Sequence, residues 1–158
     1  MFFSGLCHRK RKTENVKKSR RVPYYQLSHT ADAAWRIRGE SLAELFANAA
    51  AALTATLTDR RYVRSREIRE VVIEAPDREA LLVDWLNHLL YLFDTEGFLA
   101  RDVIILSLSD HRLETRVLGE IYDPHRHPQK TAVKAATYHH LEIIPKNRGW
   151  QATVILDL

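Results

Sequence analysis

One residue near the start and the last two residues of this 158-residue sequence are expected to carry carboxylate oxygens suited to a hard divalent cation. Asp32 closes the segment His29–Asp32, which follows the first strand-like run, and Asp157 is the second-to-last residue. Leu158 supplies a terminal carboxylate. Carboxylate oxygens are the ligands that Ca²⁺ and Mg²⁺ prefer. The set is therefore a candidate metal site, although residue type alone also allows a turn carboxylate at Asp32 and a solvated strand end at Asp157.

Four further polar residues are candidate contacts to a partner or a nucleotide. Lys130 and Lys134 lie in a polar loop that precedes a strand, where a lysine is either a solvated edge residue or a contact to phosphate or carboxylate. His139 is either a polar anchor within that strand or a site residue. Asp84 belongs to a polar stripe on an otherwise apolar helix, and the stripe is either the wet edge of that helix or part of a partner surface.

Histidine pairs in the last third of the chain raise the question of a zinc site. His125 and His127 lie two residues apart in the polar loop, and His139 and His140 are adjacent on a predicted strand. Neighbouring strand residues point to opposite faces, so we do not expect His139 and His140 to share an ion. These spacings do not favour zinc. The sequence also contains no nucleophile elbow and no phosphate-binding glycine loop.

Hydrophobic periodicity and capping residues predict the elements that must position these side chains. Strands are predicted at residues 24–28, 34–38, 67–74, 103–109, 113–121, 135–144 and 150–156, and helices from 41 to about 58 and from 77 to about 96. Ser41 with Glu44 forms a capping box, Asp77 is the second N-cap, and Gly97 follows the second helix. The order ββαβαββββ predicts an α+β domain of two layers, with two helices packed on a mainly antiparallel sheet.

The positive charge of the chain is concentrated at its beginning. Residues 1–21 contain eight Lys and Arg against one acid, a net charge of +7, whereas the whole chain carries +4, which leaves residues 22–158 at −3. We expect residues 1–22 to form a disordered basic extension, able to bind phosphate backbones non-specifically, and residues 23–158 to form one domain. A single cysteine and the absence of a long apolar run predict a cytoplasmic protein with no membrane partner.

Five motifs occur in an order that resembles the archease family. They are HTAD at 29–32, LLVDWLNHLLYLFDTEG at 81–97, GE at 119–120, VKAATYH at 133–139 and VILDL at 154–158. The resemblance covers residues 24–158. It implies a small α+β protein that is not itself an enzyme but promotes guanylylation and multiple turnover of an RtcB-type RNA ligase in tRNA splicing and RNA repair. RNA and GTP would then be engaged indirectly, through the ligase.

The resemblance also implies a divalent-metal site at Asp32, Asp157 and Leu158, with Ca²⁺ as the expected ion and Mg²⁺ or Mn²⁺ as alternatives. The sequence departs from the family at His140, where a glycine is common, and in its basic extension. Three other functions remain open on the sequence: a stand-alone metal-dependent hydrolase, a chaperone-like module that binds nucleic acid or protein, and a structural subunit of a complex.

Overall fold

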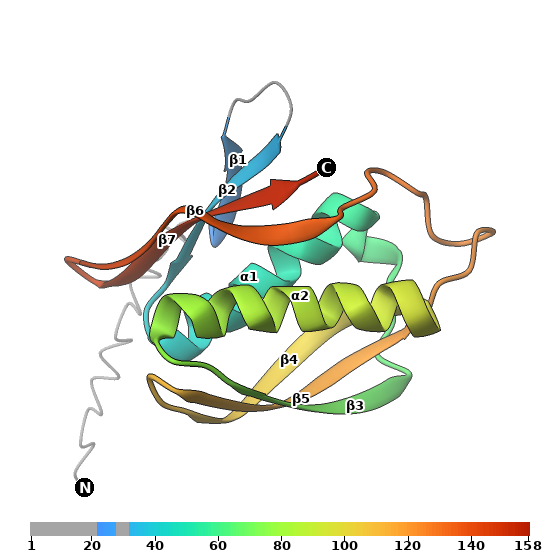
Figure 1. Cartoon of the computed structure of the whole chain (residues 1–158). Helices are drawn as coiled ribbons and strands as arrows, with labels where there is room; N and C mark the ends of the chain where they lie inside the picture. Colours follow the sequence, from blue (N-terminus) through green and yellow to red (C-terminus); the bar gives the residue numbers. More distant parts are fainter. Residues whose placement is uncertain (1–21, 28–31) are drawn as a thin grey trace, which may run out of the picture.

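The computed structural model describes residues 22–27 and 32–158. The predicted basic extension, apart from residue 22, and the first three residues of the HTAD motif lie outside this range. Seven strands and two α-helices follow in the predicted order ββαβαββββ, with a short 3₁₀ helix, η1 (Arg60–Tyr62), after the first helix (Figure 1). The elements are β1 (Tyr24–Leu27), β2 (Asp32–Gly39), α1 (Leu42–Leu57), β3 (Glu67–Glu74), α2 (Arg78–Glu96), β4 (Phe98–Leu108), β5 (Arg112–Ile121), β6 (Ala135–Lys146) and β7 (Gly149–Asp157).

The strands form two antiparallel sheets rather than the single sheet that the sequence predicts. The four-stranded sheet has the order β1-β2-β7-β6 and the three-stranded sheet the order β3-β5-β4. Both helices lie between the sheets, which makes three layers where two were expected (Figure 1). The physical reason is that α2 is apolar nearly all round: Leu81, Leu82 and Trp85 are fully buried, so a single sheet could not cover the helix.

The ends of both helices follow the predicted capping residues. The hydroxyl of Ser41 accepts a hydrogen bond from Glu44 N at 3.1 Å, and the carboxylate of Asp77 accepts one from Ala80 N at 2.8 Å. Gly97 ends α2 in the left-handed conformation, with φ 71°, which a residue without a Cβ adopts at little cost. These local signals fix the positions of α1 and α2 along the chain.

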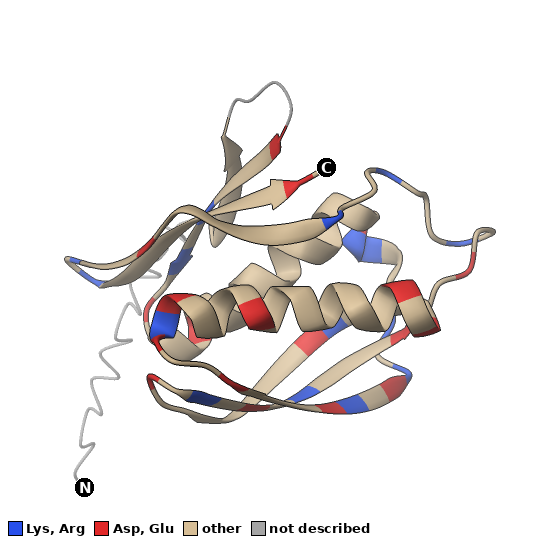
Figure 2. Ribbon diagram, in the orientation of Figure 1, with Lys and Arg blue, Asp and Glu red and all other residues tan. Residues whose placement is uncertain are grey.

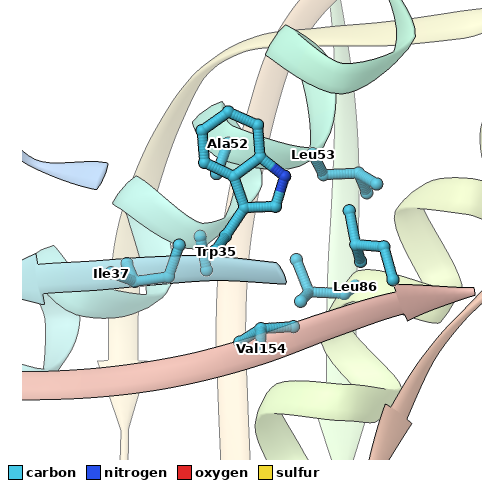
Figure 3. A pocket seen from close by; sticks show the side chains of 8 residues that line it. Trp35, Ile37, Ala52, Leu53, Leu86 and Val154 are labelled. Carbon is cyan, nitrogen blue, oxygen red and sulfur yellow. The ribbon is translucent and has the colours of Figure 1, made fainter. Parts of the chain in front are cut away.

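A small apolar gap remains between the helices and the four-stranded sheet. Its volume is about 10 Å³, and its lining includes Trp35 from β2, Leu53 from α1, Leu86 from α2 and Val154 from β7 (Figure 3). A gap of this size is at the lower limit for a single water molecule. It is a packing defect of the core and too small for a ligand.

Candidate cation site at one end of the four-stranded sheet

The two aspartates singled out in the sequence are direct partners across neighbouring strands. Asp32 is the first residue of β2 and Asp157 is the last residue of β7, and the antiparallel register places them opposite each other. Directly opposed residues have Cβ atoms about 5 Å apart. The structure therefore brings together two carboxylates from opposite ends of the sequence. The predicted second strand was two residues too short, because β2 begins at Asp32 rather than at residue 34.

Both aspartates lie on the face of the sheet that the helices do not cover. Ala33 and Leu156, their neighbours in β2 and β7, are only 1% and 2% exposed and face the core. Because strand residues alternate between faces, the side chains of Asp32 and Asp157 are turned outward, and both are exposed. Figure 2 shows acidic positions at the adjacent ends of β2 and β7.

Among the described residues, 22–27 and 32–158, no lysine or arginine forms an ion pair with either member of this pair, Asp32 or Asp157. Like charges at directly opposed sheet positions destabilise the pair of strands. Two carboxylates held face to face without a counter-charge form a donor set that fits a hard divalent cation.

The third predicted ligand, Leu158, is held in place by packing. Its side chain is half-buried and packs against the hydrophobic core. Along the chain, Leu158 directly follows Asp157, which is the last residue of β7 and one member of the aspartate pair. No group of three or more His, Cys, Asp and Glu side chains is placed to hold a metal ion within the described residues. A site here would consist of two side chains and a terminal carboxylate.

Lys134 is placed beside the aspartate pair by the main chain. Its N–H donates to the carbonyl of Asp157 at 2.8 Å, and the next residue, Ala135, is paired with Asp157 across β6 and β7. Asn87 of α2 fixes this end of β6: its side-chain amide donates to Ala136 O at 3.2 Å, and its side-chain oxygen accepts from Ala136 N at 2.8 Å. Asn87 thus anchors the start of the strand that directly follows Lys134.

The other candidate contacts lie elsewhere. Lys130 closes the C-terminal end of α1, where its N–H donates to Leu57 O at 3.1 Å and its ammonium group donates to Ala55 O at 3.3 Å. Asp84 is half-buried on α2 and accepts a hydrogen bond from the hydroxyl of Tyr138 at 3.3 Å. Burial and the neighbouring Asp84 carboxylate raise the pKa of Tyr138. A role for Lys130 or Asp84 in contacting a partner stays a prediction.

The expectation that His139 and His140 point to opposite faces is wrong. Their ring centroids lie 4.0 Å apart. The register of β6 with β7 shifts between Thr137 and Glu142, and His140 has φ 54°, in the left-handed region. This irregularity interrupts the alternation that the prediction assumed. Glycine adopts positive φ without steric cost. The backbone conformation at His140 therefore explains why the family resemblance leads us to expect a glycine at this position.

A buried pair that the sequence did not identify, Glu120 and His127, fastens the loop between β5 and β6. Asp123 N donates to His127 Nδ1 at 2.8 Å, so the other ring nitrogen carries the proton and donates to the Glu120 carboxylate at 2.7 Å. Burial opposes ionisation of Glu120, but hydrogen bonds from Arg126, His127 and the Arg64 N–H prevail and lower its pKa to about 2. With both ring nitrogens engaged, His127 is a structural residue rather than a zinc ligand. The open groove of about 430 Å³ beside Glu120 is lined by side chains that largely pair with one another.

The fold and this site define a small α+β domain that holds paired carboxylates, without an ion-pair partner among the described residues, at the ends of two central strands. Comparison with known proteins shows the family: residues 24–158 match the archease protein family (MTH1598/TM1083), and the chain belongs to it. It is 36% identical over 139 residues to the protein archease of Methanosarcina barkeri, covering 85% of this chain and 95% of that one. It is 40% identical over 144 residues to the protein archease of Thermococcus gammatolerans, covering 88% and 99%.

Solved structures agree with the fold. The solution structure of protein 1598 from Methanobacterium thermoautotrophicum is similar with a TM-score of 0.73 and 37% identity, covering 86% of this chain and 99% of that one. The crystal structure of an archease, described as a possible chaperone, from Thermotoga maritima has a TM-score of 0.57 at 22% identity, covering 87% and 97%, and supports the fold alone. Among the described residues, none of the helices combines the length and apolar character needed to cross a bilayer.

Proposed function

We propose that this archease is a non-catalytic, metal-binding activator of an RtcB-type RNA ligase, promoting its guanylylation and multiple turnover. The observation that supports this most directly is the opposed, unbalanced pair Asp32 and Asp157 on an exposed sheet face. Family membership and the motif resemblance supply the partner class.

The two aspartates and the Leu158 carboxylate would hold the cation, with Ca²⁺ as the expected ion and Mg²⁺ or Mn²⁺ as alternatives. A bound divalent cation supplies positive charge that stabilises phosphate oxygens. Three protein ligands leave several coordination positions of such an ion open. The site is therefore suited to binding an ion whose coordination a partner protein completes, rather than to tight structural binding. Lys134, held beside Asp157, would add a cationic contact at the same interface.

The geometry gives less support to catalysis by this chain alone. The carboxylate pair lies on an exposed sheet face, at the ends of two central strands. The small gap in the core is apolar, and the groove beside Glu120 is lined largely by mutually paired charges. General acid–base chemistry relies on groups whose pKa is tuned toward neutrality by their surroundings. Near that groove, the pKa of Glu120 is lowered to about 2, which is away from neutrality.

The test is multiple-turnover ligation by an RtcB-type ligase with and without stoichiometric protein, comparing wild type with Asp32→Asn. Glu70→Gln is the matched control, because it removes one negative charge from the outer face of the other sheet. Acceleration by wild type and Glu70→Gln, lost in Asp32→Asn, would support both the role and the site. Acceleration by all three would retain the role and refute the site.

Three other results would replace the proposal. Release of phosphate or nucleotide by the purified protein without ligase would indicate a hydrolase. Equal RNA or protein binding by wild type and Asp32→Asn, without any effect on ligation, would indicate a chaperone-like module. A stable complex with the ligase that leaves turnover unchanged would indicate a structural subunit.

A further inference from the structure

A second cluster lies on the same uncovered sheet face, at the opposite end of β2 from Asp32. Arg36 and Arg38 alternate with core-facing Ile37, which is 1% exposed, so both arginines are turned outward. Tyr25 of β1 is paired with Arg36, and both guanidinium groups contact it. Its hydroxyl accepts a hydrogen bond from Arg36 Nη1 at 3.3 Å and one from Arg38 Nη2 at 3.4 Å. Figure 2 shows basic positions along β2 beyond its acidic end.

The hydrogen-bonding capacity of this cluster is largely unused. Neither Arg36 nor Arg38 has a carboxylate partner within the part of the chain that the structure describes. Each guanidinium carries five N–H donors, and the contacts to Tyr25 use one on each. Arg36 Nε is buried and has no hydrogen-bond partner among the described residues, an arrangement that costs free energy. Across the sheet, Arg36 is opposite Thr153 of β7, which is in turn opposite Glu142 of β6. The first acid in this row of paired residues is therefore two strands away from Arg36.

From these observations we infer that Tyr25, Arg36 and Arg38 form a binding site for the phosphodiester backbone of a single-stranded RNA. A planar guanidinium can donate two parallel hydrogen bonds to two oxygens of one phosphate group. Two arginines that are not paired with carboxylates have donors left for such bonds. The Tyr25 hydroxyl accepts from both arginines, so its own proton remains to donate to a phosphate oxygen. The tyrosine ring lies 5.9 Å and 5.2 Å from the two guanidinium carbons and holds them on a common platform.

The connection to the basic segment favours a polyanion over a small anion. Arg38 N donates to Pro23 O at 2.8 Å, so the chain joins segment 1–21, with its net charge of +7, to the sheet directly beside the arginine pair. Charges distributed along a segment and a sheet face match a ligand that carries one phosphate per residue. The choice of RNA rests on the proposed function, whereas the site itself uses neither the aspartate pair nor the ligase. Failure of RNA binding here is therefore distinguishable from failure of ligase activation.

The test is fluorescence anisotropy of a labelled single-stranded RNA of mixed sequence with the full-length protein, from low to moderate salt. Arg36→Gln/Arg38→Gln should lower affinity about tenfold and reduce the slope of log K against log salt by about 1.4, two phosphate contacts at about 0.7 each. The control Arg112→Gln/Arg116→Gln removes the same charge from the outer face of the three-stranded sheet, where both arginines are already paired with glutamates. Its affinity should change less than about twofold.

Equal losses in both double variants would overturn the site, because net charge alone would then explain binding. An unchanged RNA affinity in Arg36→Gln/Arg38→Gln would also overturn the site, because the basic segment alone would then account for RNA binding. Equal displacement of the RNA by polyglutamate would show that phosphate is not recognised. If the double variant does not fold by circular dichroism, the Arg36 and Arg38 side-chain N–H resonances of wild type should shift as RNA is added, and unchanged resonances would refute the proposal.

Discussion

Replacing Asp32 by asparagine is expected to change the stability of the protein in opposite directions with and without metal. Asparagine keeps the size of the side chain and removes one of two opposed charges at the Asp32–Asp157 position. Without metal, the repulsion between the carboxylates disappears and the variant gains stability. With metal, the wild type gains binding free energy that the variant has lost.

The magnitude follows from the geometry of the pair. Two unit charges about 5 Å apart repel by about 0.8 kcal/mol at the dielectric constant of water and by about 3 kcal/mol at an effective value near 20. Both side chains are exposed, so we expect a gain of about 1 kcal/mol for Asp32→Asn, or roughly 3 °C in Tm for a domain of this size. A cation at one hundred times its Kd stabilises the wild type by about 2.7 kcal/mol, which is roughly 8 °C.

The assay is differential scanning calorimetry in a chelator and then in increasing Ca²⁺, Mg²⁺ or Mn²⁺, on wild type, Asp32→Asn and the control Glu70→Gln. Wild type and Glu70→Gln should respond to the ion, and Asp32→Asn should start higher and respond weakly. An equal response in Asp32→Asn would refute the site. A wild-type Tm that no ion raises would refute the reasoning that the unbalanced pair exists to hold a cation.

Two further predictions concern residues outside the aspartate pair. His140→Gly should stabilise the protein by about 1 kcal/mol in urea denaturation, because φ 54° costs a residue with a Cβ about that much, whereas the control His139→Gly should not stabilise it. Glu120→Gln should destabilise it by about 2 kcal/mol at neutral pH, because charge-assisted bonds from Arg126 and His127 are weakened, while Glu114→Gln should cost much less. The pKa of Glu120 is lowered from 4.5 to about 2, so its contribution is present above pH 4.5 and is lost as pH falls toward 2. Acid titration of stability should therefore be flatter in Glu120→Gln over that range, and an unchanged profile would contradict the assignment.

The features that sequence patterns predicted are those with local physical causes. Helix ends followed from Ser41, Asp77 and Gly97, because capping depends on residues three or four positions apart. The alternation of β5 was also predictable, since Leu113 and Val117 are fully buried on one face as the period of two requires. The order of elements and the α+β class followed from these signals.

Features that depend on pairing between distant segments were not predictable in the same way. The second sheet arises from which strands pair, and periodicity within one strand does not specify its partner. The sequence of β6 has an unbroken strand-like pattern. It therefore gives no sign of the irregularity that brings His139 and His140 together. The burial of His127 against Glu120 depends on how the loop folds back, so a histidine that looked like a loop residue is 1% exposed.

The register of β2 connects the two surface clusters. Asp32, Arg36 and Arg38 share one face because they are separated by even numbers of residues, so a single strand presents carboxylate chemistry at one end and guanidinium chemistry at the other. Asp32 and Arg36 are about 13 Å apart along the strand, which exceeds a Debye length of about 8 Å at physiological salt. Charges at that separation are largely screened, and substitutions without shared partners have additive effects. The two ends should therefore act independently: a cation at the aspartate pair neither requires the arginines nor neutralises them. If both proposals hold, one uncovered sheet face would present separate places for a divalent ion and for a phosphate backbone.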